Sequence, residues 1–283
     1  MARSRSLVPA VGLLVLLAML VGACGRSAAP AATDAPAAGA PAGDAKTVAD
    51  LKGRTLLIGS DTTYPPMDYV DDQKQIVGFD IDMMDEVGKL INAKVEFKSF
   101  PSFDAIFAAL ANKEFDLVVS AVSITEERKQ IIAFSDPYLS IGQVIAAPVG
   151  NTTIATIDDL KSARLIGVQG GTTGEEAVKS AGIPAEQIKR YDTVDLAFQD
   201  LANGALDAVV ADGPPAARYT DQLKDKIKVV GEPFTTEDYG IALQKDDAEL
   251  QAAVNAALKE LKANGTLEKL MEKWNLAKVA KLP

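Results

Sequence analysis

The residues best suited to bind a charged ligand each follow a predicted strand. Arg128 comes shortly after the run 117–120, and its planar guanidinium could hold a carboxylate through two parallel hydrogen bonds. Asp212 follows the run 208–211 and could accept hydrogen bonds from an ammonium group. Each also has a simpler interpretation. Arg128 could pair with a neighbouring glutamate one turn inside a short helix capped by Thr125, and Asp212 could be a helix N-cap.

Two other segments supply candidate contacts. Asp61 and Tyr64 follow the first predicted strand. Tyr64 and Phe103 could enclose a flat or cationic side chain whose polar tip Asp61 receives, although Phe103 could equally be a core aromatic and Asp61 a turn residue. The turn QGGTTG at 169–174 joins a strand to a helix, so its backbone N–H groups could bind an anion. It lacks the Gly-Lys-Ser/Thr ending of a phosphate-binding loop.

The composition excludes several kinds of chemistry. The 283-residue chain has no histidine and one cysteine, Cys24, so a Ser-His-Asp triad, a His-ligated metal, a Cys-His nucleophile and an internal disulfide are all impossible. The formal net charge is −10, which makes nucleic acid a poor partner because its phosphates would repel the chain. We expect no metal and no cofactor.

Alternating strands and helices position the candidate residues. In the first half we expect strands at 55–59, 95–97 and 117–120 and helices at 81–91 and 103–111. In the second half we expect strands at 165–168 and 208–211 and helices at 174–180 and 195–203. This alternation is typical of an α/β fold with parallel sheets.

One stretch of sequence occurs twice. FDAIFAALANKEFDLVVSA at 103–121 aligns with VDLAFQDLANGALDAVVAD at 194–212, with eight identities in nineteen positions. Two similarly built lobes explain the repeat, although two unrelated helix-turn-strand units could also match by coincidence. Ligands of open α/β sheets bind beyond the carboxyl ends of the strands, so the repeat indicates two binding edges, after Val119 and after Val210.

The first residues resemble a targeting signal. Arg3 and Arg5 precede an apolar run at 7–21, which is too short to span a bilayer and is followed by Val-Gly-Ala-Cys24. We expect a signal peptide at 1–23 and a diacylglycerol on the Cys24 thiol, although a plain signal peptide with an incidental cysteine would look similar. The segment 24–49 is rich in Ala, Pro and Gly and is expected to be a disordered linker.

The order of motifs over about residues 50–276 resembles the polar amino-acid-binding proteins of ABC importers. The segment ITEERKQIIAFSDPY is the most specific part of the resemblance. The other segments that carry it are GSDTTYPPM, VGFDIDMMDEVGKL, FDAIFAAL, GVQGGTTGE, LDAVVADGPPA, YGIAL and LKANGTLEKLMEKW. This family has the periplasmic-binding-protein-like type II fold, with two α/β lobes and a hinge between them.

The resemblance also implies a role for each candidate residue. Arg128 would grip the α-carboxylate of a free amino acid, Asp212 would take its α-ammonium group, and Asp61 would face its side chain. The other implied contacts are Tyr64, Phe103, Ser120, Ala121, Ser123, Gln169, Thr172 and Thr173. The chain departs from the family pattern at Ala121, where Gly or Ser is common. It also has Gln169 and Ala211 where some glutamine-binding relatives have Lys and His.

The resemblance further implies a lobe formed by 50–140 and 240–283, and a second lobe at 145–236. The chain would cross between the lobes near 140–146 and 233–239. The expected protein is a monomeric, extracytoplasmic lipoprotein that closes over a polar, basic L-amino acid and delivers it to an ABC permease and its ATPase. Asp61 with two aromatic residues favours arginine, lysine or ornithine, and glutamine remains open.

Two other functions remain open at this point. Cyclohexadienyl dehydratases resemble these binding proteins, and such an enzyme could use a carboxyl group as general acid without histidine. No additional acid is clearly assigned to that task, so we expect a binding protein and not an enzyme. A sensor domain is the third possibility, and because no second apolar run precedes Pro283 it would need a separate partner protein.

Overall fold

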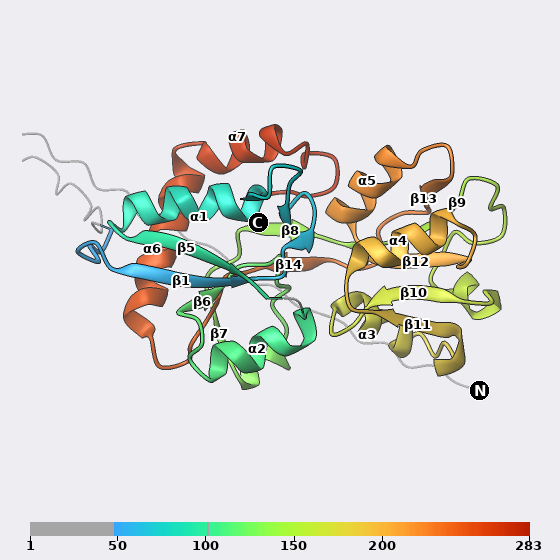
Figure 1. Ribbon diagram of the computed structural model, residues 1–283, viewed down its shortest axis with the longest axis horizontal. Helices are drawn as coiled ribbons and strands as arrows, with labels where there is room; N and C mark the ends of the chain where they lie inside the picture. The colour runs from blue at the N-terminus through green and yellow to red at the C-terminus, as the bar shows by residue number, and fades with distance from the viewer. Residues whose placement is uncertain (1–47, 101) are drawn as a thin grey trace, which may run out of the picture. The chain divides into compact units, whose positions relative to one another are not determined.

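The computed structural model describes residues 48–100 and 102–283 of the chain, which form two five-stranded sheets and their covering helices (Figure 1). The predicted signal peptide, the lipidation site Cys24 and nearly all of the predicted linker lie outside the described residues. In the first sheet the strand order is β5 (Lys94–Ser99), β1 (Thr55–Ser60), β6 (Leu117–Val118), β15 (Ala242–Leu243) and β7 (Ala133–Phe134). In the second sheet the order is β11 (Ile188–Tyr191), β10 (Ile166–Gln169), β12 (Ala208–Asp212), β9 (Gln143–Pro148) and β13 (Ile227–Val230).

Helices cover both faces of the first sheet. The apolar stripe of α1 (Phe79–Leu90), with Met83, Met84 and Val87 fully buried, packs in one core together with α6 (Ala248–Ala263) and α7 (Thr266–Lys273). On the opposite face, α2 (Phe103–Ala111) buries Ile106 and Leu110 in a separate cluster. Figure 1 shows α1 and α2 on opposite sides of β1.

The second sheet is covered in the same manner. Helix α3 (Thr173–Ser180) lies over one face, where Val178 is buried with Ile166 and Val168 of β10. Helix α4 (Val194–Ala202) buries Phe198 and Leu201 on the other face. Helix α5 (Gly213–Gln222) begins directly after β12.

The sheets contain the expected parallel strands together with antiparallel ones, so each sheet is mixed. Strand β1 runs parallel to β5 and β6, and β10 runs parallel to β11 and β12. Strands β15, β9 and β13 run antiparallel to their neighbours. β9 and β15 come directly after the chain has crossed from one sheet to the other, and they enter their new sheets against the direction of the strands already there.

Two short strands lie on the segments that cross between the sheets. Strand β8 (Leu139–Ile141) pairs antiparallel with β14 (Glu237–Tyr239), and Ser140 stands opposite Asp238. A small separate sheet follows β1 and consists of β2 (Thr63–Tyr64), β3 (Asp68–Val70) and β4 (Ile76–Val77).

The repeated sequence forms equivalent units in the two sheets. Both copies give a nine-residue helix, α2 and α4, that leads to the third strand of its sheet, β6 and β12. The repeated aspartates make equivalent contacts. Asp116 accepts a hydrogen bond from the Leu57 N–H at 2.8 Å and pairs with Arg54. Asp207 likewise accepts a hydrogen bond from the N–H of Arg164 at 2.5 Å and pairs with its guanidinium.

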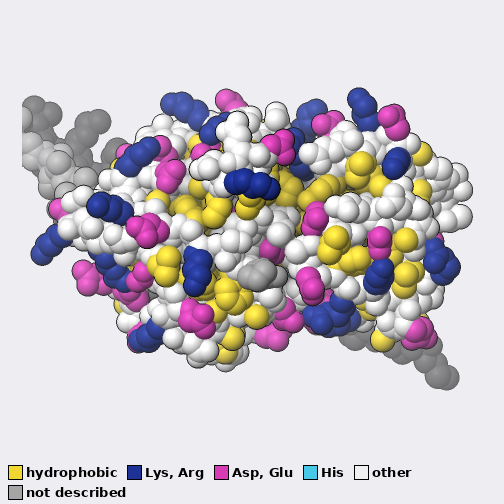
Figure 2. Space-filling view, in the orientation of Figure 1, with side chains coloured by type: hydrophobic (Ala, Val, Ile, Leu, Met, Phe, Trp, Pro, Cys, Tyr) yellow, Lys and Arg dark blue, Asp and Glu magenta, His cyan; other side chains and the backbone are white. Residues whose placement is uncertain are grey.

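The described residues contain no helix that is both long enough and apolar enough to cross a membrane. On the face seen in Figure 2, Lys and Arg side chains alternate with Asp and Glu side chains. Charges of both signs are therefore mixed on this face, with no extended basic patch.

Two fully buried carboxyl groups lie beneath the loop that follows β6. Asp68 Oδ2 accepts hydrogen bonds from the hydroxyls of Ser60 and Ser120, both at 2.5 Å. Asp80 accepts from the Ala121 N–H at 2.7 Å and from the Tyr138 hydroxyl at 2.9 Å. Ala121 has φ +48°, a backbone conformation that favours glycine, so these acids hold the loop in an unusual conformation.

The buried acids make the stability of the fold depend on pH. Burial, with the charge of Asp80 as a further cause, raises the pKa of Asp68 well above its ordinary value. Burial raises the pKa of Asp80 to about 7. Because the folded state prefers the protonated carboxyls, their contribution to stability is fully present below about pH 4. The contribution of Asp80 is lost as the pH rises through about 7, and that of Asp68 is lost as the pH rises through its own raised pKa.

We therefore predict that Asp68→Asn stabilises the protein at high pH. The asparagine oxygen can still accept from both serines but carries no charge, so the free energy of unfolding at pH 8 should rise by about 1–3 kcal/mol relative to the wild type. At pH 5 the difference should vanish or reverse. Thermal unfolding at several pH values measures this, with the exposed Asp72→Asn as control. Parallel pH profiles for Asp68→Asn and the wild type would contradict the prediction.

Candidate functional site

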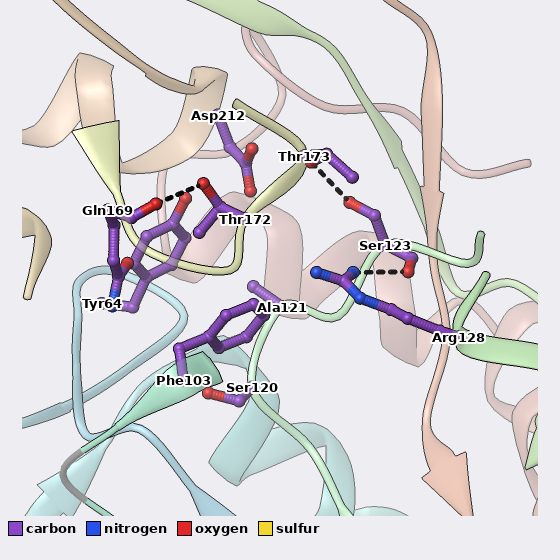
Figure 3. Close-up of a pocket in the computed structure, with 10 residues that line it drawn as sticks. All are labelled: Tyr64, Phe103, Ser120, Ala121, Ser123, Arg128, Gln169, Thr172, Thr173 and Asp212. Atoms are coloured by element: carbon purple, nitrogen blue, oxygen red, sulfur yellow. Dashed lines mark hydrogen bonds between the residues drawn. The ribbon is translucent and has the colours of Figure 1, made fainter. Parts of the chain in front are cut away.

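A small cavity lies between the two sheets, lined by ten residues (Figure 3). Its lining comes from the strand ends and loops of both sheets. The lining residues are Tyr64, Phe103, Ser120, Ala121, Ser123, Arg128, Gln169, Thr172, Thr173 and Asp212. The structure thus brings together ten of the eleven residues that the sequence singled out for ligand contact. Asp61 is not in the lining, but it accepts a hydrogen bond from Gln169, which is.

Arg128 is a buried cation on the wall formed by the first sheet. It begins a 3₁₀ helix, Arg128–Gln130, and its N–H donates to Thr125 Oγ1 at 3.2 Å. The helix begins at Arg128 with Glu127 in its N-cap position, so the expected position of Arg128 one turn inside a helix capped by Thr125 is wrong, although Thr125 accepts a hydrogen bond from the Arg128 N–H. Its two terminal nitrogens donate to the backbone carbonyls of Ser123, at 2.7 Å, and Gly171, at 2.9 Å.

The surroundings of Arg128 leave its charge without a counter-ion. Its guanidinium carbon lies 5.3 Å from the ring centroid of Phe103 and 4.7 Å from that of Phe107. Within residues 48–100 and 102–283 no carboxylate pairs with it, because Glu126 pairs with Lys129 instead. The proposed pairing with a neighbouring glutamate is therefore wrong. Burial lowers the pKa of Arg128, and nearby acids oppose that shift.

Asp212 is the acidic counterpart on the second sheet. It occupies the N-cap position of α5, but its side chain makes no capping hydrogen bond. Its two oxygens instead accept hydrogen bonds from the Gln143 amide and the Tyr239 hydroxyl. Burial, reinforced by the negative charge of Glu237, raises the pKa of Asp212 to about 6. The carboxyl is therefore mainly ionised at neutral pH and can accept bonds from a cation.

The sequence analysis missed three residues on the crossing segments. Gln143 and Tyr239 fix Asp212 from β9 and β14, and both are fully buried. Glu237 accepts a hydrogen bond from Ser123 Oγ at 2.7 Å. Tyr239 belongs to the YGIAL segment of the family resemblance, which was a usable signal. Gln143 and Glu237 lie in the predicted crossing segments 140–146 and 233–239, but nothing assigned them a contact in the site.

The glycine-rich turn begins α3. The Thr172 hydroxyl accepts from the Glu175 N–H at 3.3 Å and donates to the Gln169 carbonyl at 2.8 Å, so it caps the helix. Thr173 Oγ1 lies 3.1 Å from Gln143 Nε2 and 3.5 Å from Ser123 Oγ. The Thr173 hydroxyl therefore faces Ser123 on the wall that contains Arg128, whereas the Thr172 hydroxyl is engaged within its own turn.

The remaining lining residues come from β2, the start of α2, the loop after β6 and the end of β10. Tyr64 and Phe103 are both 7% exposed. Asp61 accepts hydrogen bonds from Gln169 Nε2 and Thr63 Oγ1, at 2.7 and 2.8 Å, and burial raises its pKa. Gln169 Oε1 is buried and has no partner among the described residues. Ser120 Oγ is already engaged, because it donates to Asp68 and accepts from the Asp61 N–H.

No cluster of His, Cys, Asp or Glu side chains suited to a metal ion occurs in the part of the chain that the structure describes. The arrangement is instead a small polar cavity with a buried cation on one wall and a buried carboxylate on the other. It can bind opposite charges on one small molecule.

Known proteins with similar sequences are binding proteins. A probable histidine-binding protein of Neisseria gonorrhoeae is 37% identical over 82% of this chain and 87% of its own length. The L-cystine-binding protein TcyJ of Escherichia coli is 35% identical over 80% of this chain and 85% of its own. These names agree with the expectation of a binding protein and not an enzyme.

Solved structures give the same result. An ancestral arginine-binding protein bound to arginine superimposes with a TM-score of 0.74 at 42% identity, covering 78% of this chain and 97% of that one. An ancestral amino-acid-binding protein, a precursor of cyclohexadienyl dehydratase, gives 0.72 at 40% identity, covering 78% and 95%. The expected fold, two α/β lobes with a hinge, is therefore confirmed.

The family model for bacterial extracellular solute-binding proteins, family 3, matches residues 56–277. That match covers both sheets and every residue of the cavity. The chain belongs to the family 3 bacterial extracellular solute-binding proteins.

Proposed function

We propose that this protein captures a free basic L-amino acid in the cavity between its sheets and delivers it to an ABC permease and its ATPase. The observation that carries the proposal is the buried Arg128 guanidinium, which has no carboxylate partner among the described residues and shares a cavity with the carboxylate of Asp212. A free amino acid supplies the missing carboxylate and brings an ammonium group for the acid.

The head group of the ligand would lie between the two walls. The α-carboxylate accepts from Arg128 and from the first turn of α3, where Thr172 and Thr173 begin the helix. The α-ammonium donates to Asp212, which Gln143 and Tyr239 already hold in place. Ser123, hydrogen-bonded to Glu237, completes the wall beside the carboxylate.

The side chain would extend toward Tyr64, Phe103 and the Asp61–Gln169 pair. Gln169 Oε1 is a buried acceptor without a partner in the described residues, and Asp61 is an acid hydrogen-bonded to the Gln169 amide. Two acceptors next to aromatic faces suit a guanidinium or ammonium group. The similar arginine-binding protein supports arginine as ligand, and because that protein is also known with bound glutamine, a neutral amide is the main competitor.

Binding would be coupled to hinge motion. The first lobe would consist of residues 50–140 and 240–283, and the second of residues 145–236. The hinge would consist of β8, β14 and the start of β9. A ligand that touches both lobes stabilises the closed arrangement because it makes those contacts only there. The Cys24 thiol would carry a diacylglycerol that holds the monomeric protein at the outer side of the cell membrane.

Arg128→Ala should weaken binding of L-arginine by at least about a hundredfold. Hydrogen bonds to charged groups are worth roughly 1.5–3 kcal/mol each, and the guanidinium can supply two of them. Isothermal titration calorimetry measures the change, with Lys129→Ala, a neighbouring exposed cation, as control. N-acetyl-L-arginine and L-argininamide should not bind. Near-normal affinity of Arg128→Ala would contradict the head-group assignment.

Asp61→Asn should reduce the preference for cationic side chains. In the wild type, arginine or lysine should bind more tightly than glutamate, whose carboxylate would be repelled by the negative charge of Asp61 beside Gln169. The substitution removes that charge and should narrow the difference by about tenfold. Some preference for a cation should remain, because a cation over an aromatic face is worth ~0.5–2 kcal/mol by itself. Competition among all twenty amino acids against labelled arginine tests this. A wild type that prefers glutamate or aspartate would contradict the pocket assignment.

Cys24→Ala should release the protein from the membrane. The wild type should partition into the detergent phase of a Triton X-114 extraction and show a lipid-modified N-terminal cysteine by mass spectrometry. The variant should appear in the aqueous phase with unchanged arginine affinity. An unmodified mature N-terminus at another residue of the wild type would show that the lipoprotein assignment is wrong.

A further inference from the structure

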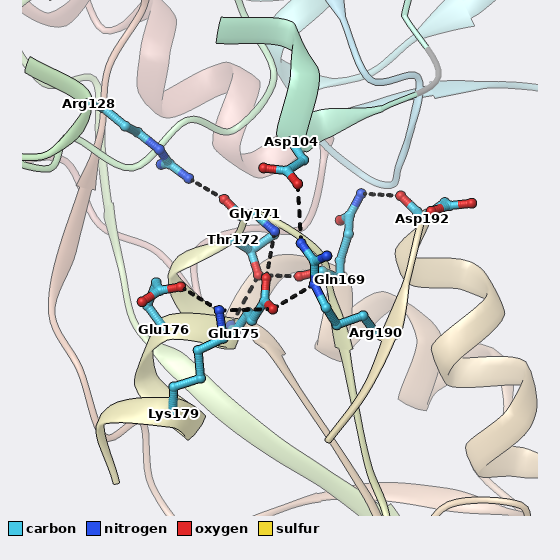
Figure 4. A network of polar contacts seen from close by, with 10 residues as sticks. All are labelled: Asp104, Arg128, Gln169, Gly171, Thr172, Glu175, Glu176, Lys179, Arg190 and Asp192. Carbon is cyan, nitrogen blue, oxygen red and sulfur yellow. Dashed lines mark hydrogen bonds and ion pairs between the residues drawn. The ribbon is translucent and has the colours of Figure 1, made fainter. Parts of the chain in front are cut away.

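Arg190 on β11 contacts two acids that belong to different parts of the fold (Figure 4). Its Nε lies 2.6 Å from Glu175 Oε1, in α3 of the same lobe. One of its terminal nitrogens lies 3.2 Å from Asp104 Oδ2, in α2 of the other lobe. The second contact is an ion pair across the cleft, outside the cavity that holds the proposed ligand site.

The backbones are also close at this point. A Cβ atom on Gly171 would lie 2.8 Å from the Asp104 Cα and 2.8 Å from its Oδ1. Gly171 has φ +75°, which is also a conformation that favours glycine. The ion pair between Arg190 and Asp104 therefore lies at a tightly packed contact between the lobes.

The contact with Glu175 connects Arg190 to the binding loop. The Glu175 side chain is 2% exposed, and its Oε2 accepts from the Gly171 N–H at 2.8 Å. The carbonyl of the same Gly171 accepts from Arg128 at 2.9 Å. Through Glu175, Arg190 thus supports the Gly171 peptide, whose carbonyl accepts the hydrogen bond from Arg128. Through Asp104, it also connects this loop to the first lobe.

We propose that Arg190 is a positioning residue whose ion pair with Asp104 latches the closed form and slows release of the ligand. The inference rests on the proposed function, because the latch matters only if the lobes must separate for the amino acid to leave. Neither side chain lines the cavity, so the pair acts on the rate of opening and not on ligand contacts.

The exposure of the pair sets the size of the effect. The side chains of Arg190 and Asp104 are 54% and 63% exposed, so water and salt screen their attraction. An exposed ion pair of this kind corresponds to a change of roughly two- to fivefold in an equilibrium or rate. The effect should be largest in dilute buffer and should disappear near 1 M salt, where the screening length is only about 3 Å.

The test compares release of tritiated L-arginine, chased with excess unlabelled arginine, at 20 mM and 1 M NaCl. Asp104→Asn removes the cross-lobe pair and leaves the Arg190–Glu175 contact in place. It should accelerate release about two- to fivefold in low salt and leave the rate unchanged in high salt. Salt also screens the ligand's own contacts, so the informative quantity is the difference between the variant and the wild type at each salt concentration.

Two further variants make the test specific. Asp104→Glu retains the charge and should restore slow release. Asp158→Asn makes the same charge change in the exposed Lys161 pair within the second lobe, and it should have no effect. A wild type that binds arginine but releases it at the same rate as Asp104→Asn in low salt would overturn the latch alone. A wild type that binds no amino acid would overturn the proposed function and, with it, this inference.

Discussion

A positive charge held away from water, with no counter-ion among the residues that the structure describes, is the constraint on which the site depends. Removing a guanidinium from water is costly, and the backbone carbonyls and aromatic faces around Arg128 compensate only partly. The carboxylate of a ligand would provide the rest, so the binding free energy would include the pairing that the protein itself does not make. The walls, the capped α3 and the hinge are arranged so that this charge remains accessible from one small cavity.

Neighbouring polar groups are tied to fixed partners, which leaves few of them free to rearrange. Asp212 is held from both sides by residues of the hinge, and the Ser120–Ala121 loop is held by Asp68 and Asp80 beneath it. Buried polar networks of this kind are stable only when nearly every donor and acceptor is satisfied. Several buried acceptors have no hydrogen-bond partner among the described residues, and of these Gln169 Oε1 belongs to a residue that lines the cavity.

The sequence predicted most of the cavity in two ways. Strand ends and the repeat located the two binding edges, and Arg128, Asp212, Asp61, Tyr64 and Phe103 were candidates there. The remaining contacts, and the role of each residue, came from the resemblance to a known family. The direction of β15 and the positions of Gln143 and Glu237 were not predictable in this way. They depend on which distant segments pair after the chain has crossed, and a two-residue strand carries no pattern that reveals its partner. The ion pair of Arg190 and Asp104 was missed for the same reason, since 86 residues separate them.

The missing side chain at Gly171 determines how near the two lobes can come. Gly171 lies directly against the backbone of Asp104, so the lobes approach until the two main chains are nearly in contact. A methyl group on Gly171 would collide with Asp104 and keep the lobes farther apart. The lobes would then stop short of the position at which Arg128 reaches the Gly171 carbonyl. A single added carbon atom at Gly171 would thereby leave the lobes less closed, and an amino acid bound between them would be less fully enclosed.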